Sequence, residues 1–189
     1  MVKPCLMSAA RNCVYSRRRS GLSTGKSNMA FGVLGNAKFV GVPYGLTSGF
    51  LYVEMGSHQR TTNGIDLRDY DVKAPYFQVP LIFNYWILNN LLVGMGGYLG
   101  FPGGNIKTTG TQTFFVTTPI DLTQSFSAAN YREIDWGAVG HAQYKYVIGK
   151  FFATATLMYE YGIEDVNALT DVTTRNSAFL ALVGAGLEI

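Results

Sequence analysis

Two histidines are the residues of this sequence best suited to act as general bases near neutral pH. His58 follows Ser57, but adjacent residues of a strand point to opposite faces, so the two side chains do not form a nucleophile–base pair. His141 lies near Gln143 and Lys145, without a serine or carboxylate at an informative spacing. We therefore predict no catalytic residues and no enzymatic activity, with a lipid-modifying hydrolase as a less favoured alternative.

Motifs for metals and cofactors are missing from the sequence as well. Cys5 and Cys13 give neither a disulfide framework nor a CxxC metal pair. The glycines of 94–97 and 184–186 lie inside apolar strands without a following helix, so they indicate close packing rather than nucleotide binding. We expect no metal and no cofactor.

The basic residues of 16–26 form the main positive cluster, which includes Arg17, Arg18 and Arg19. Recognition of nucleic acid requires basic residues together with aromatic platforms on one face, and this loop lacks the platforms. The sequence therefore predicts no nucleic-acid partner. Lipopolysaccharide phosphates are the acidic groups that this cluster would meet at a cell surface.

Composition narrows the fold class. Charged residues make up 14% of the 189 residues, against about 25% in soluble proteins, and hydrophobic residues make up 48%. This balance excludes a disordered chain. The most apolar stretch, 76–101, is interrupted by Pro80, three asparagines and several glycines, which excludes a spanning helix. A β-rich protein remains.

Alternation between turn signals predicts eight strands in a single domain, 1–189. Their ranges are 2–13, 28–39, 46–58, 74–87, 91–101, 132–146, 151–162 and 176–188. Three connections are short: 40–45, 88–90 and 147–150. Four connections are long and polar: 14–27, 59–73, 102–131 and 163–175. Within 102–131, the apolar residues of 114–116 suggest that the flanking strands continue as a hairpin. Short and long connections alternate, which in an up-and-down barrel places all long loops at one end, as in outer-membrane barrels.

The two faces of the predicted strands differ in polarity, which is compatible with an apolar face turned either to lipid or to a soluble core. Aromatic residues gather near both strand ends, as the two membrane interfaces favour, and this selects a membrane barrel. The predicted lipid-facing belt contains Leu51, Val53, Phe77, Val79, Leu81, Phe83, Trp136 and Leu157. The predicted polar lumen network contains Lys38, Glu54, Gln78, Asn84, Gln143, Lys145 and Glu160. Lys145 and Glu160 flank one short turn, so we expect them to pair.

Several segments resemble the PorT-like outer-membrane β-barrel family of Gram-negative bacteria. They are 2–8, 48–56, 76–85, 135–137 and 159–167. Gln78 and Asn84 replace charged residues of the family pattern, Met158 stands where an arginine is common, and Ile189 replaces a terminal aromatic residue. The resemblance implies an outer-membrane location but no single activity.

Together these features predict an eight-stranded antiparallel up-and-down transmembrane β-barrel with short periplasmic turns, long extracellular loops and a filled lumen. We expect structural, surface-recognition or assembly roles, a lipid and lipopolysaccharide environment, insertion by the barrel-assembly machinery, and a monomer. A signal peptide is expected to precede Met1. The alternative functions are a narrow conduit or binder for small apolar molecules and, less favoured, a soluble lipocalin-like barrel.

Overall fold

The structure is a computed structural model that describes residues 2–8, 12–14, 22–25, 29–63, 66–114, 116–125, 127–129, 134–163 and 176–187. Within these ranges the chain forms twelve β-strands. They are β1 (Val2–Ser8), β2 (Asn12–Val14), β3 (Leu22–Gly25), β4 (Ala30–Lys38), β5 (Tyr44–Asn63), β6 (Asp66–Leu88), β7 (Leu91–Pro102), β8 (Ile106–Phe114), β9 (Val116–Gln124), β10 (Asp135–Ile148), β11 (Phe151–Gly162) and β12 (Ser177–Leu187).

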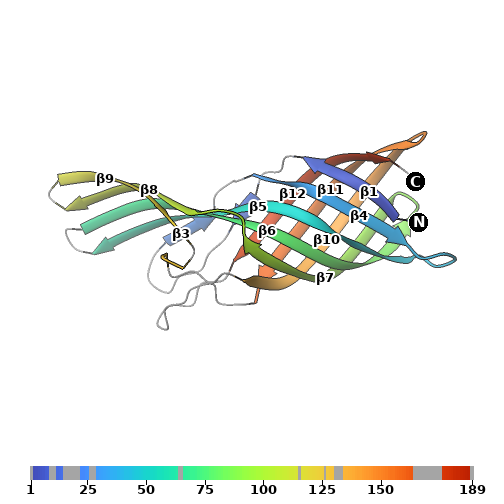
Figure 1. Cartoon of the computed structure of the whole chain (residues 1–189), viewed down its shortest axis with the longest axis horizontal. Helices are drawn as coiled ribbons and strands as arrows, with labels where there is room; N and C mark the ends of the chain where they lie inside the picture. The colour runs from blue at the N-terminus through green and yellow to red at the C-terminus, as the bar shows by residue number, and fades with distance from the viewer. Residues whose placement is uncertain are drawn as a thin grey trace.

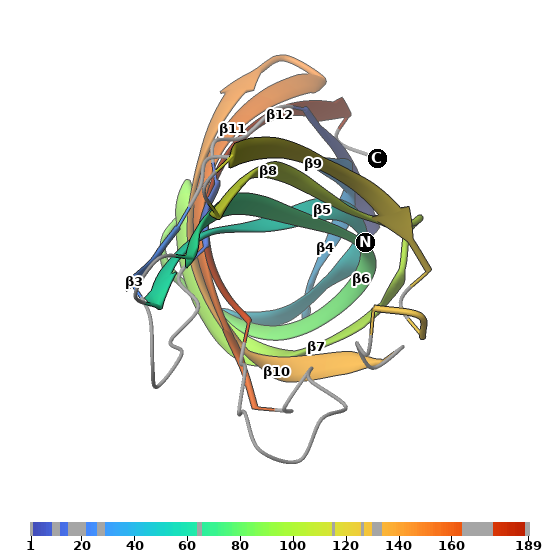
Figure 2. The same cartoon turned by 90° about the vertical axis from the view of Figure 1, so that its left-hand side faces the viewer.

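A nearly closed antiparallel barrel forms the body of the molecule (Figures 1 and 2). Its wall follows the order β4, β5, β6, β7, β10, β11, β12, and each strand pairs with the next. β1 pairs with β12 on one side and with β4 on the other, and so lies between the two ends of this wall. The strand order confirms the predicted all-β, antiparallel barrel in which sequence neighbours are spatial neighbours.

Short turns join the barrel strands at one end. β6 and β7 are joined by Asn89 and Asn90, and β10 and β11 by Gly149 and Lys150. Gly149 has a φ of 64°, a conformation that residues with a Cβ rarely adopt, and such a glycine is typical of a two-residue hairpin turn. β1 begins and β12 ends at this same end, because Val2 lies opposite Ala37.

An extension of the sheet projects from the other end of the barrel, and here one of the predicted loops is wrong. The predicted loop 59–73 is instead a continuation of β5 and β6, which remain paired from Tyr44 to Asn63. Much of the predicted loop 102–131 forms the β8–β9 hairpin, and β8 pairs with β6. β3, inside the predicted loop 14–27, pairs with β5. Figure 1 shows this extension on the left of the barrel.

The extension arises because segments rich in threonine or in charged residues form strands as readily as loops when a neighbouring strand accepts their backbone hydrogen bonds. β6 has 23 residues, which at roughly 3.3 Å per residue is about 76 Å, more than twice the roughly 30 Å hydrocarbon core of a bilayer. The strands therefore continue well beyond any membrane that the barrel crosses.

The predicted orientation of β5 is wrong. Leu51 and Val53, expected to face lipid, are 0% exposed, whereas Phe50 is 69% exposed. The ladder explains the reversal, because directly opposed residues of neighbouring strands share a face. Val53 lies opposite Ala30 on β4 and Tyr76 on β6, both fully buried. Both faces of β5 carry apolar residues, so its own alternation does not determine which face turns inward.

The interior is more apolar than the sequence predicted. Leu51, Ile82, Met158 and Leu180 are completely buried beside polar side chains from the same strands. The predicted arrangement, with a polar face turned inward and an apolar face turned outward, therefore holds for β10 better than for β5 or β12. The described residues include no helix that is both long and apolar enough to span a membrane.

Candidate functional site: the barrel interior and its outer wall

A chain of hydrogen bonds crosses the barrel interior in its short-turn half. We call these six residues the amide layer; they are Asn36, Thr47, Asn84, His141, Gln143 and Thr156. Asn84 is completely buried; its amide donates to Oγ1 of Thr47 at 2.5 Å, and its Oδ1 lies 2.8 Å from Nε2 of His141. Thr47 donates in turn to Oδ1 of Asn36.

The amide layer spans the barrel from β4 to β10. Asn36 on β4 donates to Oε1 of Gln143 on β10 at 3.0 Å, and Gln143 donates to Oγ1 of Thr156 at 3.0 Å. β4 and β10 lie on opposite sides of the wall, since β11, β12 and β1 separate them in one direction and β5, β6 and β7 in the other. Side chains therefore obstruct the lumen at this level.

A second polar cluster, the acidic layer, lies toward the extension. Its members are Gln78, Tyr98, Asp135, Glu160 and Asn176. Oδ2 of Asp135 accepts from the Tyr98 hydroxyl at 3.3 Å and from the Asn176 amide at 2.9 Å. The Gln78 amide donates to Oε2 of Glu160 at 3.1 Å. All of these side chains are buried.

Two lysines lie at the short-turn end. Nζ of Lys38 is 5.5 Å from the ring centroid of Trp86, and Nζ of Lys145 is 4.6 Å from that of Phe152. Lys38 is exposed, so it belongs to the mouth and not to a buried network. The expected pair of Lys145 and Glu160 is wrong, because Lys145 lies opposite Thr154, six positions along β11 from Glu160.

Glu54 was also predicted to point into the lumen, and the structure places it on the outer face instead. It shares that face with Tyr52, whose ring stacks on the exposed Phe31. Its Oε1 lies 2.9 Å from Nζ of Lys73, which is 44% exposed. This ion pair lies just beyond the end of the apolar outer wall, where the extension begins.

Exposed apolar side chains cover the outer wall. Members of the predicted belt found there are Phe77, Leu81, Phe83, Trp136 and Leu157. Val79 points the same way but is only partly exposed. Leu51 and Val53 do not belong to this surface, as described above. A soluble monomer rarely exposes a contiguous apolar area of this kind.

Aromatic rings form one row at each end of the outer wall. Phe31, Tyr52, Phe77 and Phe101 lie opposite one another on four successive strands, and the first two contacts have ring centroids 5.0 and 5.5 Å apart. We call these four residues the upper aromatic row.

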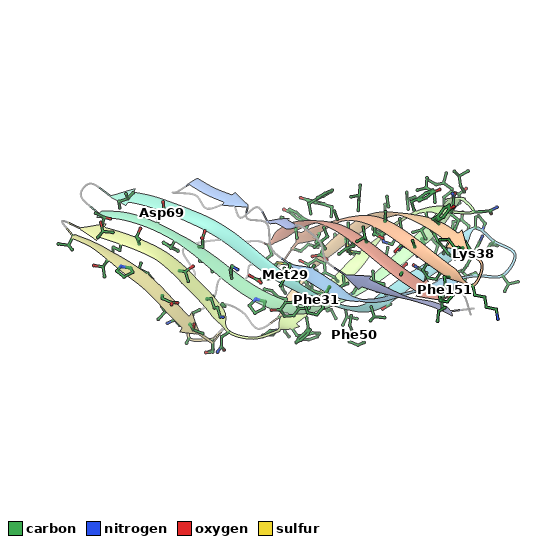
Figure 3. All side chains as sticks on the ribbon, turned by 90° about the horizontal axis from the view of Figure 1, so that it is seen from above. Met29, Phe31, Lys38, Phe50, Asp69 and Phe151 are labelled. Atoms are coloured by element: carbon green, nitrogen blue, oxygen red, sulfur yellow. The ribbon has the colours of Figure 1, made fainter. Side chains whose placement is uncertain are left out.

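At the short-turn end, Tyr44 packs on Phe83 and Tyr85 with centroids 5.6 and 5.4 Å apart. Figure 3 shows Phe31 near the junction with the extension, Lys38 and Phe151 at the opposite end, and Asp69 on the extension itself.

The positions of the rows set the height of the apolar wall. On the outward face of β6 the exposed apolar side chains alternate from Phe77 to Ile87. Ten residues correspond to about 33 Å of strand at roughly 3.3 Å each. A tilt of about 40°, usual in small barrels, reduces this to about 25 Å along the barrel axis, the height of the apolar band of outer-membrane barrels.

Several members of these layers were missed by reasoning from the sequence. Asn36, Thr47 and Tyr98 were not singled out; Tyr98 alternates with the exposed Gly97 and Leu99, whereas Asn36 lies between two half-buried residues. Arg17, Arg18 and Arg19 lie outside the described residues. Within the described ranges, no group of three or more histidine, cysteine, aspartate or glutamate side chains is arranged to hold a metal ion.

Comparison with known proteins gives structural likeness only. No protein-family model matches the chain, and no curated protein matches it. Ail, the attachment invasion locus protein of Yersinia pestis, is 15% identical with a TM-score of 0.46, and 99% of each chain is covered. The outer membrane protein OprG from Pseudomonas aeruginosa is 13% identical with a TM-score of 0.48, covering 98% of this chain and 93% of its own. The predicted PorT-like resemblance is not supported by these matches and stays a prediction.

Proposed function

We propose that this chain is an integral outer-membrane β-barrel protein without enzymatic activity, whose filled barrel anchors a projecting β-sheet. The observation that carries the proposal is the apolar outer wall, about 25 Å high between two aromatic rows, around an interior with polar layers. Backbone groups in a bilayer must be satisfied within the protein, and the paired strands of the barrel wall meet this requirement.

The extension suggests which roles such a protein has outside the membrane. From Phe77 to Asp66, β6 continues for eleven residues, about 36 Å at roughly 3.3 Å per residue, with paired neighbours on both sides. We infer that this sheet stands outside the membrane on the side of the long connections and supports surface recognition, structural or assembly roles. This proposal requires three partners: lipid, lipopolysaccharide and the barrel-assembly machinery. The barrel acts as a monomer.

The amide layer argues against the alternative of a narrow conduit. Its hydrogen bonds join opposite sides of the wall, from Asn36 to Gln143, and an eight-stranded barrel has an interior only wide enough for side chains. We expect no stepwise conductance in planar bilayers. Steady single-channel currents from the purified chain would favour the conduit instead.

Cysteine labelling in membranes tests the proposal directly. In a background with Cys5→Ser and Cys13→Ser, we introduce Leu81→Cys, on the outer wall, and Val53→Cys, its buried match. Position 81 is expected to react with a lipid-soluble maleimide and to resist a membrane-impermeant one, while position 53 resists both. A chain that is monodisperse without detergent, with position 81 open to the water-soluble reagent, would show a soluble barrel.

A further inference from the structure

Three oxygen atoms of the acidic layer accept no hydrogen bond from any described residue. They are Oδ1 of Asp135, Oε1 of Glu160 and Oε1 of Gln78. All three side chains are 0% exposed. In the described part of the chain neither carboxylate has a lysine or arginine as an ion-pair partner. Carboxylates buried without a compensating charge are costly, so this cluster is stabilised either by protonation or by a bound positive charge.

The ladders bring these side chains together around a glycine. Gln78 on β6 and Asp135 on β10 both lie opposite Gly100 on β7, so all three residues share one row of the sheet. Directly opposed residues share a face, so Gln78 and Asp135 both point inward beside a position that has no side chain. A Cβ at Gly100 would lie 3.5 Å from Cβ of Asp135 and 3.5 Å from Cδ1 of Tyr76.

Glu160 reaches this row from β11. Its Oε2 accepts the hydrogen bond from Gln78 at 3.1 Å, while its Oε1 remains without a donor. The NH₂ group of Gln78 therefore donates to a carboxylate, while its carbonyl oxygen has no hydrogen-bond donor. A carbonyl oxygen only accepts hydrogen bonds, so it cannot serve as a donor for the neighbouring carboxylate oxygens. All three orphaned atoms need a donor or a cation.

The chemistry of these atoms selects the ligand. They are two carboxylate oxygens and one amide oxygen, and the single nearby histidine, His141, belongs to the amide layer. Oxygen-only sets suit hard cations, and carboxylates with amide carbonyls are usual ligands of Ca²⁺, which tolerates irregular geometry. Mg²⁺ requires a nearly ideal octahedron. Two carboxylates also match a charge of two.

We propose that the acidic layer binds a hard divalent cation of the calcium class between Asp135, Glu160 and Gln78. Oδ1 of Asp135, Oε1 of Glu160 and Oε1 of Gln78 are its protein ligands. Asn176 and Tyr98 hold the other oxygen of Asp135 and thereby orient the carboxylate. The ion links β6, β10 and β11 at the end of the barrel from which the extension projects.

Terbium luminescence tests this on the full chain, folded in whichever solvent keeps it monodisperse. Tb³⁺ replaces Ca²⁺ at oxygen sites and emits when a nearby tyrosine is excited, and Tyr98 lies within 3.3 Å of Asp135. We expect saturable emission that Ca²⁺ reverses and that Na⁺ at equal ionic strength does not. The Asp135→Asn and Glu160→Gln variants should each weaken binding at least tenfold.

Glu54→Gln is the matched control, since it removes a carboxylate on the outer face and should leave Tb³⁺ binding unchanged. If the Asp135 variant does not fold, Gly100→Ala replaces it, because the added methyl makes ordinary contacts beside Cβ of Asp135 and fills space between Asp135 and Gln78. No saturable emission, or equal binding by the parent and both acidic-layer variants, would overturn the proposal. If those variants unfold at a higher temperature than the parent chain, and their thermal stability does not respond to Ca²⁺, then a shared proton or a water molecule takes the place of the cation.

Discussion

An arginine at position 81 probes the outer wall most directly. Leu81 is 60% exposed and lies on β6 midway between Phe77 of the upper aromatic row and Tyr85 near the short-turn end. It therefore falls at the middle of the apolar band. Arginine at the midplane of a membrane barrel costs about 2–4 kcal/mol. Unfolding should become easier by about 30- to 700-fold in equilibrium constant at 1.4 kcal/mol per tenfold.

Ile87→Arg is the matched change at the edge of the band. Ile87 is 51% exposed on the same face of the same strand. It lies six residues from Leu81, about 20 Å along the strand, and about 15 Å along the axis at a tilt of about 40°. Near an interface the cost of arginine falls to about 0–1 kcal/mol.

Guanidinium titrations in phospholipid vesicles, followed by tryptophan fluorescence and extrapolated linearly, measure both free energies of unfolding. We expect the two variants to differ by at least about 1 kcal/mol, the gap between the two depth-dependent ranges. Equal costs at the two positions, or a neutral Leu81→Arg, would refute the membrane assignment, because water does not distinguish two exposed sites on one strand.

Two further changes test the interior and the edge of the wall. Asn84→Ala removes the hydrogen-bond partner of His141 and Thr47, so buried polar atoms lose their hydrogen bonds. The free energy of unfolding, measured by the same titration, should fall by about 1–3 kcal/mol. An unchanged value would mean that the amide layer is not formed. Lys73→Ala breaks the ion pair with Glu54, in which only the lysine is exposed, and should cost about 0–1 kcal/mol, with a smaller effect at high salt. A loss insensitive to salt would contradict a purely electrostatic role.

The alternation of β6, β10 and β11 could be interpreted from the sequence because their two faces differ in polarity. Phe83 and Leu157 alternate with the polar Asn84 and Thr156, and the outward residues are exposed as predicted. β5 could not be interpreted in this way, since Phe50 and Leu51 are both apolar. The predicted loop 59–73 was wrong for a related reason: a polar segment is compatible with either a loop or a strand, and only a neighbouring strand decides between them.

The sequence by itself determined the all-β class, the antiparallel order of neighbours and the concentration of aromatic residues near strand ends, because these depend on periodicity and turn residues close in the chain. Only the tertiary structure decided which face of β5 turns inward, how far the strands continue, and which polar groups meet. Asn36 and Gln143 are 107 residues apart. Barrel closure brings them together, since it fixes the register of every ladder at once.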